Sequence, residues 1–177
     1  MSKGFTLIET LVAITLLTVA ITAPMELTGK SLASAYYARD QITAFHLAQE
    51  AVESVRHVRD HNVLRNALGE QADLLDGILD TGQRSRTFAI DTRNDNITTC
   101  VDTCPPLQTD GELYGYESGW ADTRFTRSVF VAFVDDGSDE VRVSVSVAWR
   151  TGAFQTRTFT ISQNLYRWVN DGSGSAN

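Results

Sequence analysis

The sequence has little of what enzymes rely on. It contains two cysteines and three histidines in 177 residues, with no Gly-rich phosphate-binding loop and no His-Glu-x-x-His zinc signature. The segment Gly115-Tyr116-Glu117-Ser118-Gly119 is close to the Gly-x-Ser-x-Gly nucleophile motif, but its serine stands in the wrong place. We therefore expect no enzymatic activity and no cofactor.

The chain also lacks an excess of positive charge. Its net charge is −7 and it has no run of basic residues, whereas general nucleic-acid binding depends on lysine and arginine at the phosphates. Nucleic acid is therefore not the expected partner. DNA capture by a local basic patch stays as a minor alternative. The arginines that could form such a patch are Arg84, Arg86, Arg93, Arg124 and Arg127.

Groups that could bind a metal ion have simpler explanations. His57 and His61 stand four residues apart on a predicted helix, a spacing that can hold a metal, and His46, Glu50 and Glu53 extend the row. A solvated helix face explains these residues, because no ligands from a second element are evident. One predicted turn is acidic enough for calcium, but its spacing is not that of an EF-hand. Its acidic residues are Asp135, Asp136, Asp139 and Glu140. We predict no metal site.

One long apolar run, from Phe5 to Ala23, dominates the N-terminus. Glu9 and five threonines are its interruptions, and about 20 helical residues suffice to cross the hydrocarbon core of a membrane. Threonine is tolerated there because its hydroxyl can bond back to the preceding turn. Lys3 precedes the run, which favours a cytoplasmic N-terminus and an exported remainder. We predict a single transmembrane helix over 5–23.

Two less specific interpretations of the apolar run stay open. A secretory signal peptide would be cut after small residues, and Ala20-Ile21-Thr22-Ala23 could form such a site. Pro24 directly after the cut and Glu9 inside the apolar core both argue against a signal peptide.

The other alternative is a one-pass anchor whose exported domain binds a ligand and never polymerises. A charge at bilayer depth costs about 2.5–3.5 kcal/mol, so Glu9 needs a partner or a function.

The segment Lys3-Gly4-Phe5-Thr6-Leu7-Ile8-Glu9, followed by an apolar helix, resembles the leader and cleavage site of type IV pilins and of the pseudopilins of type II secretion. The resemblance implies that residues 1–4 are a leader peptide. It also implies that prepilin peptidase cuts between Gly4 and Phe5 and methylates the new amine of Phe5. Glu9 stands where this family keeps a glutamate.

The physical chemistry of the segment agrees with the resemblance. Cleavage creates a cationic amine on Phe5 inside an apolar helical bundle, and a carboxylate from a neighbouring subunit can meet it where the dielectric constant is low. Either charge alone would be costly there, and together they set the axial register between subunits. We hypothesise that Glu9 pairs with the Phe5 amine of an adjacent subunit.

The helical pattern continues beyond the apolar run. Pro24 and Gly29 both disfavour a helix interior, so we predict a break or kink between them; the alternative is a helix that ends at Pro24. An apolar stripe at helical spacing then predicts a spine over 24–62 that faces a sheet. The stripe consists of Ala44, Leu47, Ala48, Ala51, Val55 and Val58.

A globular head is predicted over 63–170. Alternation of apolar and polar residues predicts strands, with a hairpin loop over 135–139. The predicted strands cover 86–91, 125–134, 141–150 and 154–162. We therefore expect an α+β, pilin-like fold in which a long N-terminal helix, transmembrane in its first half, packs against an antiparallel sheet of three or four strands.

The remaining parts of the head carry weaker patterns. Residues 66–82 suggest a short helix or an ordered connector, and 94–121 an irregular exposed loop that is long enough to be functional. Residues 171–177 are interpreted as a flexible tail. Cys100 and Cys104 lie in an exported segment, where a disulfide is the default. Many pilins instead close a long C-terminal loop with a disulfide, so this chain departs from that pattern.

The segment 44–53 resembles the alanine-rich region of minor pilins and of I-type minor pseudopilins. The interpretation that follows is a minor pilin of the pilus-modification class, held by one helix in the inner membrane with its head exported, and then built into an extracellular filament. Its implied partners are other pilin subunits, prepilin peptidase and the inner-membrane assembly platform. A minor pseudopilin of type II secretion, which would act in the periplasm, and the non-polymerising anchored domain stay as alternatives.

Overall fold

The computed structural model describes residues 4, 6–80, 82–135, 140–151 and 155–166. The chain divides into two compact units, Met1–Gln41 and Ile42–Asn177. Three predicted features lie outside the described residues: the flexible tail over 171–177, the N-terminal position Phe5, and most of the hairpin loop over 135–139.

A single helix, α1, runs from Leu7 to Ala67, with Pro24 inside it. The alternative in which a helix ends at Pro24 is therefore wrong. Proline has no N–H to donate to the carbonyl of Ala20 four residues earlier, and the hydroxyl of Thr28 donates to the Pro24 carbonyl at 2.8 Å. Since Gly29 is also helical, the predicted kink between Pro24 and Gly29 stays a prediction about other states of the helix.

The part of α1 from Ile42 onward supplies one wall of the core of the second unit. Ala44, Ala48, Ala51 and Val55 are fully buried and Leu47 is almost so. These are the predicted stripe residues, and their burial confirms the helical spacing. The stripe ends at Val58, which is half-buried.

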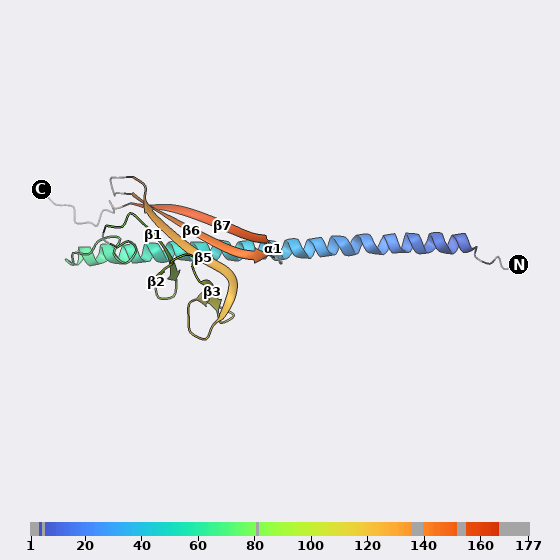
Figure 1. The fold of residues 1–177 in the computed structure, drawn as a ribbon, viewed down its shortest axis with the longest axis horizontal. Helices are drawn as coiled ribbons and strands as arrows, with labels where there is room; N and C mark the ends of the chain where they lie inside the picture. The colour runs from blue at the N-terminus through green and yellow to red at the C-terminus, as the bar shows by residue number, and fades with distance from the viewer. Residues whose placement is uncertain (1–3, 5, 81, 136–139, 152–154, 167–177) are drawn as a thin grey trace. The chain divides into compact units, whose positions relative to one another are not determined.

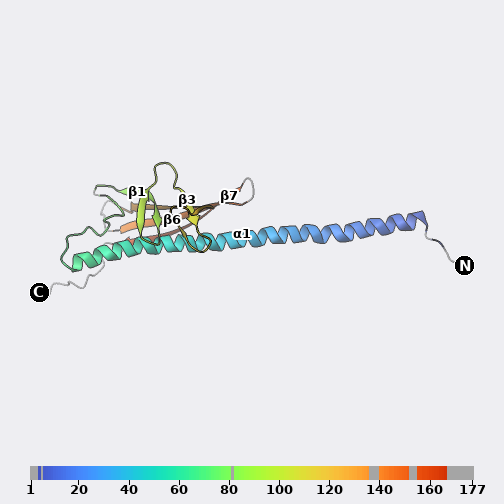
Figure 2. The same ribbon diagram turned by 90° about the horizontal axis from the view of Figure 1, so that it is seen from below.

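An antiparallel sheet of seven strands forms the other wall (Figure 1). Its strands are β1 (Ser85–Asp91), β2 (Asn96–Thr99), β3 (Pro106–Thr109), β4 (Tyr114–Gly115), β5 (Ala121–Phe133), β6 (Glu140–Thr151) and β7 (Gln155–Tyr166). Figure 2 shows the sheet along one side of the C-terminal part of α1. The expected α+β fold, a long helix packed against an antiparallel sheet, is confirmed.

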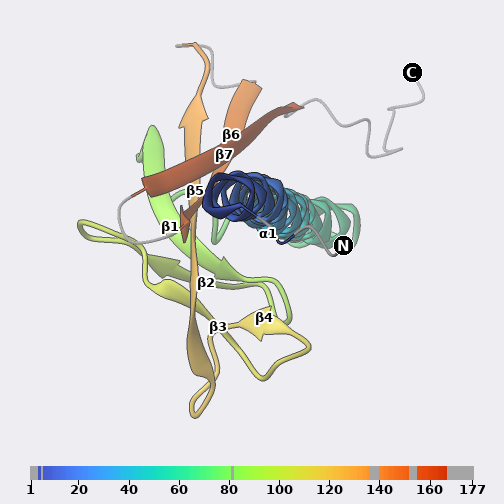
Figure 3. The same cartoon turned by 90° about the vertical axis from the view of Figure 1, so that its right-hand side faces the viewer.

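Strand β5 organises the sheet, because it pairs with three other strands. β6 pairs with one side of β5 over nine residues, and β7 pairs with β6. On its other side the C-terminal half of β5 pairs with β1 and its N-terminal half with β3. β2 and β4 extend these two branches, so that β3 and β4 lie away from β6 and β7 (Figure 3).

The two long strands bury one face each. In β6, Val141, Val143, Val145, Val147 and Trp149 are at most 3% exposed, while the residues between them are half-buried or exposed. The alternation predicted from the sequence is therefore confirmed. β5 follows the same rule, with its inward positions at Phe125, Arg127, Val129 and Val131. Its second inward position is an arginine, Arg127, which departs from the apolar pattern.

Two sequence-based predictions about the head need correction. The sheet has seven strands rather than three or four, and the stretch 94–121 is not an irregular loop, because β2, β3 and β4 lie within it. These strands contain four, four and two residues, which is too short for an alternating pattern to be visible.

The segment between α1 and β1 is an ordered connector rather than a helix in its described part. Asn62 is buried near the end of α1, and its side-chain amide donates to the carbonyls of Leu74 at 3.3 Å and Asp76 at 2.9 Å. One turn later, the Asn66 side chain bonds both the carbonyl and the amide of Ala72. Two asparagines of the helix thus supply hydrogen bonds to turns that lack regular structure of their own.

Candidate functional site

The surface of α1 between Leu7 and Ile21 is mostly apolar and exposed. The large apolar side chains between Leu7 and Ile21 are 49% to 83% exposed. By length and composition, this part of α1 could cross a membrane. A continuous apolar surface of this kind is stable in lipid or against other apolar helices, and not in water.

The threonines in this segment are adapted to a surrounding without water. Their hydroxyls donate to helix carbonyls three or four residues earlier, so they need no outside partner. The acceptors are Leu7 for Thr10, Val12 for Thr15, Ile14 for Thr18 and Thr18 for Thr22, at 2.7 to 2.9 Å. The hydroxyls of Thr10, Thr15, Thr18 and Thr22 are thereby satisfied within the helix, whereas the carboxylate of Glu9 is not.

The side chain of Glu9 is exposed in the first turn of α1, and no described residue forms an ion pair or hydrogen bond with its carboxylate. Its amide donates to the Thr6 carbonyl at 3.1 Å, and the Thr6 hydroxyl caps the same turn. A carboxylate at a helix N-terminus is favoured by the helix dipole, which is worth a few tenths to about 1 kcal/mol. That does not offset the cost of an apolar surrounding, so Glu9 needs a partner from outside the chain.

The two positions of the predicted cleavage site lie just before the helix. Gly4 is exposed and non-helical, and a Cβ built on it would meet nothing within 4 Å. Phe5 lies outside the described residues. The assignment of Gly4 and Phe5 as the processing site stays a prediction.

In the second unit, the side chain of Arg127 is fully buried between the sheet and α1. Its guanidinium donates to the carbonyl of Leu47 in α1 at 3.1 Å and to the carbonyl of Ile90 in β1 at 2.6 Å. The Glu50 carboxylate lies 3.9 Å away, and Nε has no hydrogen-bond partner in the described residues. Burial lowers the pKa of Arg127, and the negative charges of Glu50 and Asp91 oppose this effect. One arginine thus ties three elements together.

Asp91 and Tyr116 complete this buried polar group. The Asp91 carboxylate accepts hydrogen bonds from the amides of Arg93 and Tyr116, both at 3.1 Å, which hold the β1–β2 turn against the segment after β4. Burial raises the pKa of the Tyr116 hydroxyl, while the positive charge of Arg127 acts in the opposite direction. These contacts join backbone segments inside the unit, so we assign them a structural role.

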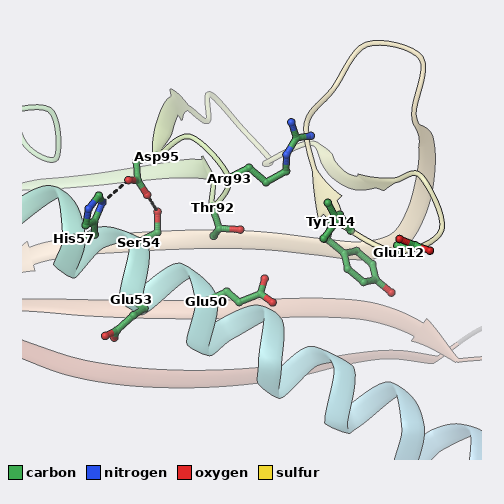
Figure 4. A pocket seen from close by; sticks show the side chains of 10 residues that line it. Glu50, Glu53, Ser54, His57, Thr92, Arg93, Asp95, Glu112 and Tyr114 are labelled. Atoms are coloured by element: carbon green, nitrogen blue, oxygen red, sulfur yellow. Dashed lines mark hydrogen bonds and ion pairs between the residues drawn. The ribbon is translucent and has the colours of Figure 1, made fainter.

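An open pocket of about 600 Å³ lies between α1, the β1–β2 turn and the β3–β4 hairpin (Figure 4). Asp95 occupies one end, with its backbone in the left-handed region at a φ of 56°. Its carboxylate accepts a hydrogen bond from the Ser54 hydroxyl and lies 2.6 Å from Nδ1 of His57. Glu50 and Glu53 of α1 and Glu112 of the hairpin add negative charge to the rim.

This pocket does not contain a nucleophile and its base. Serine and histidine both bond to the aspartate, whereas a catalytic serine must bond to the histidine that accepts its proton. The acidic side chains do not converge either: Figure 4 shows Glu53 pointing away from Asp95. Among the described residues, no three His, Cys, Asp or Glu side chains are placed to hold a metal ion. Two residues of the helix face that was predicted to be solvated have partners on the sheet side: His57 pairs with Asp95, and Glu50 lies near Arg127.

Cys100 and Cys104 form the predicted disulfide, with their Cα atoms 4.9 Å apart. The bridge closes a short loop between β2 and β3. The amide of Cys100 donates to the Thr87 carbonyl of β1 at 3.2 Å, which fixes the start of this loop on the sheet.

Sequence reasoning missed the burial of Arg127 and the role of Asp95. The alternating pattern of β5 places Arg127 on the inward face, so a stricter reading of the same period would have identified a buried charge. Asp95 carried no comparable signal, since its contacts with Ser54 and His57 join residues 41 and 38 positions apart.

Comparison with known proteins supports the interpretation of the N-terminus. Residues 1–23 match the family model described as the prokaryotic N-terminal methylation motif. No curated protein and no solved structure matches this chain. The chain that carries this motif also contains a 61-residue helix and an antiparallel sheet. The N-terminal segment is similar to that of prepilin-type proteins, and the helix and sheet behind it agree with a pilin-like fold.

The motif has general implications. Pilin-like proteins, which carry this kind of motif, are structural proteins and not enzymes. The motif implies processing by prepilin peptidase and assembly with pilin subunits. Together with the apolar helix, it indicates anchoring in the inner membrane before assembly into a surface filament.

Proposed function

We propose that this protein is a minor pilin that primes the assembly of a type IV pilus-like filament or modifies its surface. Prepilin peptidase cuts between Gly4 and Phe5 and methylates the Phe5 amine. Residues 5–23 hold the subunit in the inner membrane and later enter the filament core. The exported head over 63–170, together with the spine of α1 that packs on it, then faces the outside.

The observation that carries this proposal is the unpartnered carboxylate of Glu9. It projects from a helix surface that is otherwise apolar, and no described residue pairs with it. A second subunit whose cleaved N-terminus lies beside Glu9 supplies the missing positive charge. Such a pair is buried among apolar helices, so removal of one member leaves an uncompensated charge and costs about 3–5 kcal/mol.

The segment 44–53 supports the assignment as a minor pilin. This segment resembles the alanine-rich region of minor pilins, and its alanines are the residues that let α1 approach the sheet closely. The same segment also resembles I-type minor pseudopilins of type II secretion. A pseudopilin would undergo the same cleavage and methylation at Phe5 and use the same pairing through Glu9. It differs from a pilin in that its filament would stay in the periplasm.

Processing is tested by the intact mass of the full chain, expressed with and without a prepilin peptidase. The proposal expects loss of residues 1–4 and a gain of one methyl group on Phe5. An uncleaved chain, or a cut near Ala23, would refute filament assembly and favour the anchored or secreted domain.

Pairing is tested by the isosteric substitution Glu9→Gln, with Glu26→Gln as the matched control. Glu26 lies on the same helix and pairs with Lys30 of its own chain at 2.7 Å, so its charge does not require a partner from another subunit. We expect Glu9→Gln to lower incorporation at least tenfold, since a tenfold change needs only about 1.4 kcal/mol, and Glu26→Gln to leave it unchanged. Equal incorporation of the two variants would refute the pairing. Recovery from sheared surface filaments distinguishes a pilin from a periplasmic pseudopilin.

A further inference from the structure

The outer face of the sheet, which faces away from α1, has an unusual composition. Its positions along β5, β6 and β7 are dominated by hydroxyl side chains and contain no carboxylate between residues 142 and 150 or between 156 and 162. The hydroxyl residues are Thr126, Ser128, Ser144, Ser146, Thr156, Thr158, Thr160 and Ser162. Phe130 is the large apolar residue among them and is 45% exposed.

The hydroxyls of the β6–β7 half of this face bond to one another. Ser144 pairs with Ser162 at 2.9 Å, and Ser146 pairs with Thr160 at 2.8 Å. Their hydrogen-bonding capacity is therefore largely used within the sheet. They form a smooth polar surface and not a recognition site.

The β1–β5 half of the face is different, because it is hollowed. A depression of about 620 Å³ lies between the sheet and the disulfide loop that joins β2 to β3. Four hydroxyl residues that line it have no hydrogen-bond partner for their side chains among the described residues: Ser85, Thr87, Thr103 and Thr126. These groups are open to water and can exchange it for the hydroxyls of a ligand.

The hollow also has a small apolar surface at a defined place. Phe130 lines it and stands directly opposite Thr87 in the β1–β5 register. Val101 of the disulfide loop is 93% exposed and lies at the rim. An aromatic face carries partial negative charge and attracts weakly positive C–H groups. The combination favours a ligand with hydroxyl edges and a C–H face.

The charges of the hollow disfavour ionic ligands. Arg86 and Asp102 are the charged side chains among its described lining residues. The Arg86 guanidinium is already engaged with the Thr99 hydroxyl at 2.7 Å and with the carbonyls of Gly77 and Ile78, both at 3.3 Å. Asp102 is exposed at the rim. A phosphate or another anion would find no free cation here, so the ligand is uncharged.

We propose that this hollow binds an uncharged oligosaccharide that lies along β5. One sugar ring stacks against Phe130 and bonds Thr87, which stands opposite it. A further ring bonds Thr126, about 13 Å away along the strand. The volume falls in the range of about 300–1,000 Å³ that is typical of small-molecule sites. The disulfide between Cys100 and Cys104 gives the loop wall a fixed shape, so less ordering is needed on binding. The site is independent of Phe5 and Glu9, and it gives the exported head a binding role whether or not the protein enters a filament.

The test is calorimetric titration of the full chain with cellohexaose and, separately, with chitohexaose. The protein is held in a phosphocholine detergent, since glycoside detergents would compete for the hollow. Both probes offer β-linked rings with hydroxyl edges, and only chitohexaose adds acetamido groups. Saturable binding of either probe supports the proposal, and the preference between them defines the sugar class.

Three variants connect the binding to the hollow. Phe130→Ala removes the apolar floor, and Thr126→Val removes one hydroxyl at constant shape. Thr158→Val is the matched control, since Thr158 lies on the same face two strands away in the register of Thr126. A net hydrogen bond is worth about 0.5–1.5 kcal/mol, so we expect Thr126→Val to weaken binding about threefold to tenfold. Phe130→Ala should weaken it at least as much, and Thr158→Val should not weaken it.

Two results would overturn the proposal. One is the absence of saturable binding of both oligosaccharides at millimolar concentration by a wild-type protein whose circular dichroism is that of a folded chain. The other is binding that Thr126→Val and Thr158→Val reduce equally, because this would place the sugar on the general surface and not in the hollow. Since all three positions are at least partly exposed, the variants are expected to fold.

Discussion

The buried guanidinium of Arg127 permits a sharp prediction about stability. The side chain is fully buried and donates to the carbonyls of Leu47 and Ile90. Truncation to alanine removes both charged hydrogen bonds, each worth about 1.5–3 kcal/mol, and leaves a cavity. In the opposite direction, the alanine variant no longer has to bury a charged guanidinium on folding, and this lowers the net loss of stability. The lost hydrogen bonds and the cavity together outweigh this gain, and we expect Arg127→Ala to lose about 3–5 kcal/mol of stability.

Two further substitutions separate the charge from the shape. Arg127→Met fills much of the same space without a charge, so it should cost less than Arg127→Ala, at most about 2 kcal/mol. Arg127→Lys keeps the charge but loses the planar fork, and one ammonium group cannot reach a helix carbonyl and a strand carbonyl in the same geometry. We therefore expect the lysine variant to be less stable than the methionine variant.

The assay is denaturant unfolding of the full chain in detergent, followed by tryptophan fluorescence, because Trp149 is buried in the same core. The control is Arg142→Met, on the neighbouring strand β6. Arg142 is exposed and bonds Asn164 at 3.3 Å, so its replacement should stay within about 0.5 kcal/mol. Two results would refute the reasoning: Arg127→Lys more stable than Arg127→Met, or Arg127→Ala indistinguishable from the Arg142 variant.

Two smaller effects can be measured in the same preparation. Hydrogen bonds from the amides of Leu113 and Glu112 hold the pKa of Asp110 below its ordinary value. Since the folded-state pKa is the lower one, its stabilisation of the β3–β4 loop is complete above the ordinary value and is lost as pH falls through the folded-state value. An NMR titration of the carboxylate should show this shift, and a midpoint at or above the ordinary value would contradict it. Reduction of the Cys100–Cys104 disulfide should destabilise the head by about 2 kcal/mol at most, because the loop that it closes is short. Unfolding curves with and without a membrane-permeant phosphine measure this loss. A much larger loss would mean that the disulfide stabilises more than its own loop.

The sequence predicted the elements whose pattern is local and long. The apolar run after Phe5 and the stripe at Ala44 to Val55 were visible because each repeats a helical period over several turns. β5 and β6 were visible because inward and outward residues alternate over most of these strands of 13 and 12 residues. The strands β2 and β4 were not, since four or two residues carry no period that stands out from chance.

The candidate site shows the same division. Glu9 could be identified from the sequence because a lone carboxylate in an apolar run is a local anomaly. Asp95 and the hydroxyl-lined hollow could not, because each exists through side chains from elements far apart in the chain. The disulfide was accessible to sequence reasoning, whereas its place as a wall of the hollow depended on where β2 and β3 join the sheet.

The sequence by itself determined a methylation motif, a helix that is apolar in its first part, a second helical part that packs on a sheet, and strands long enough to alternate. The tertiary structure decided which strands pair, that Arg127 is enclosed, and which hydroxyls stay free beside Phe130. The physical reason is distance along the chain. Periodicity is set by neighbouring residues, whereas Arg127 takes its hydrogen-bond acceptors from residues 80 and 37 positions away, and no local pattern specifies such partners.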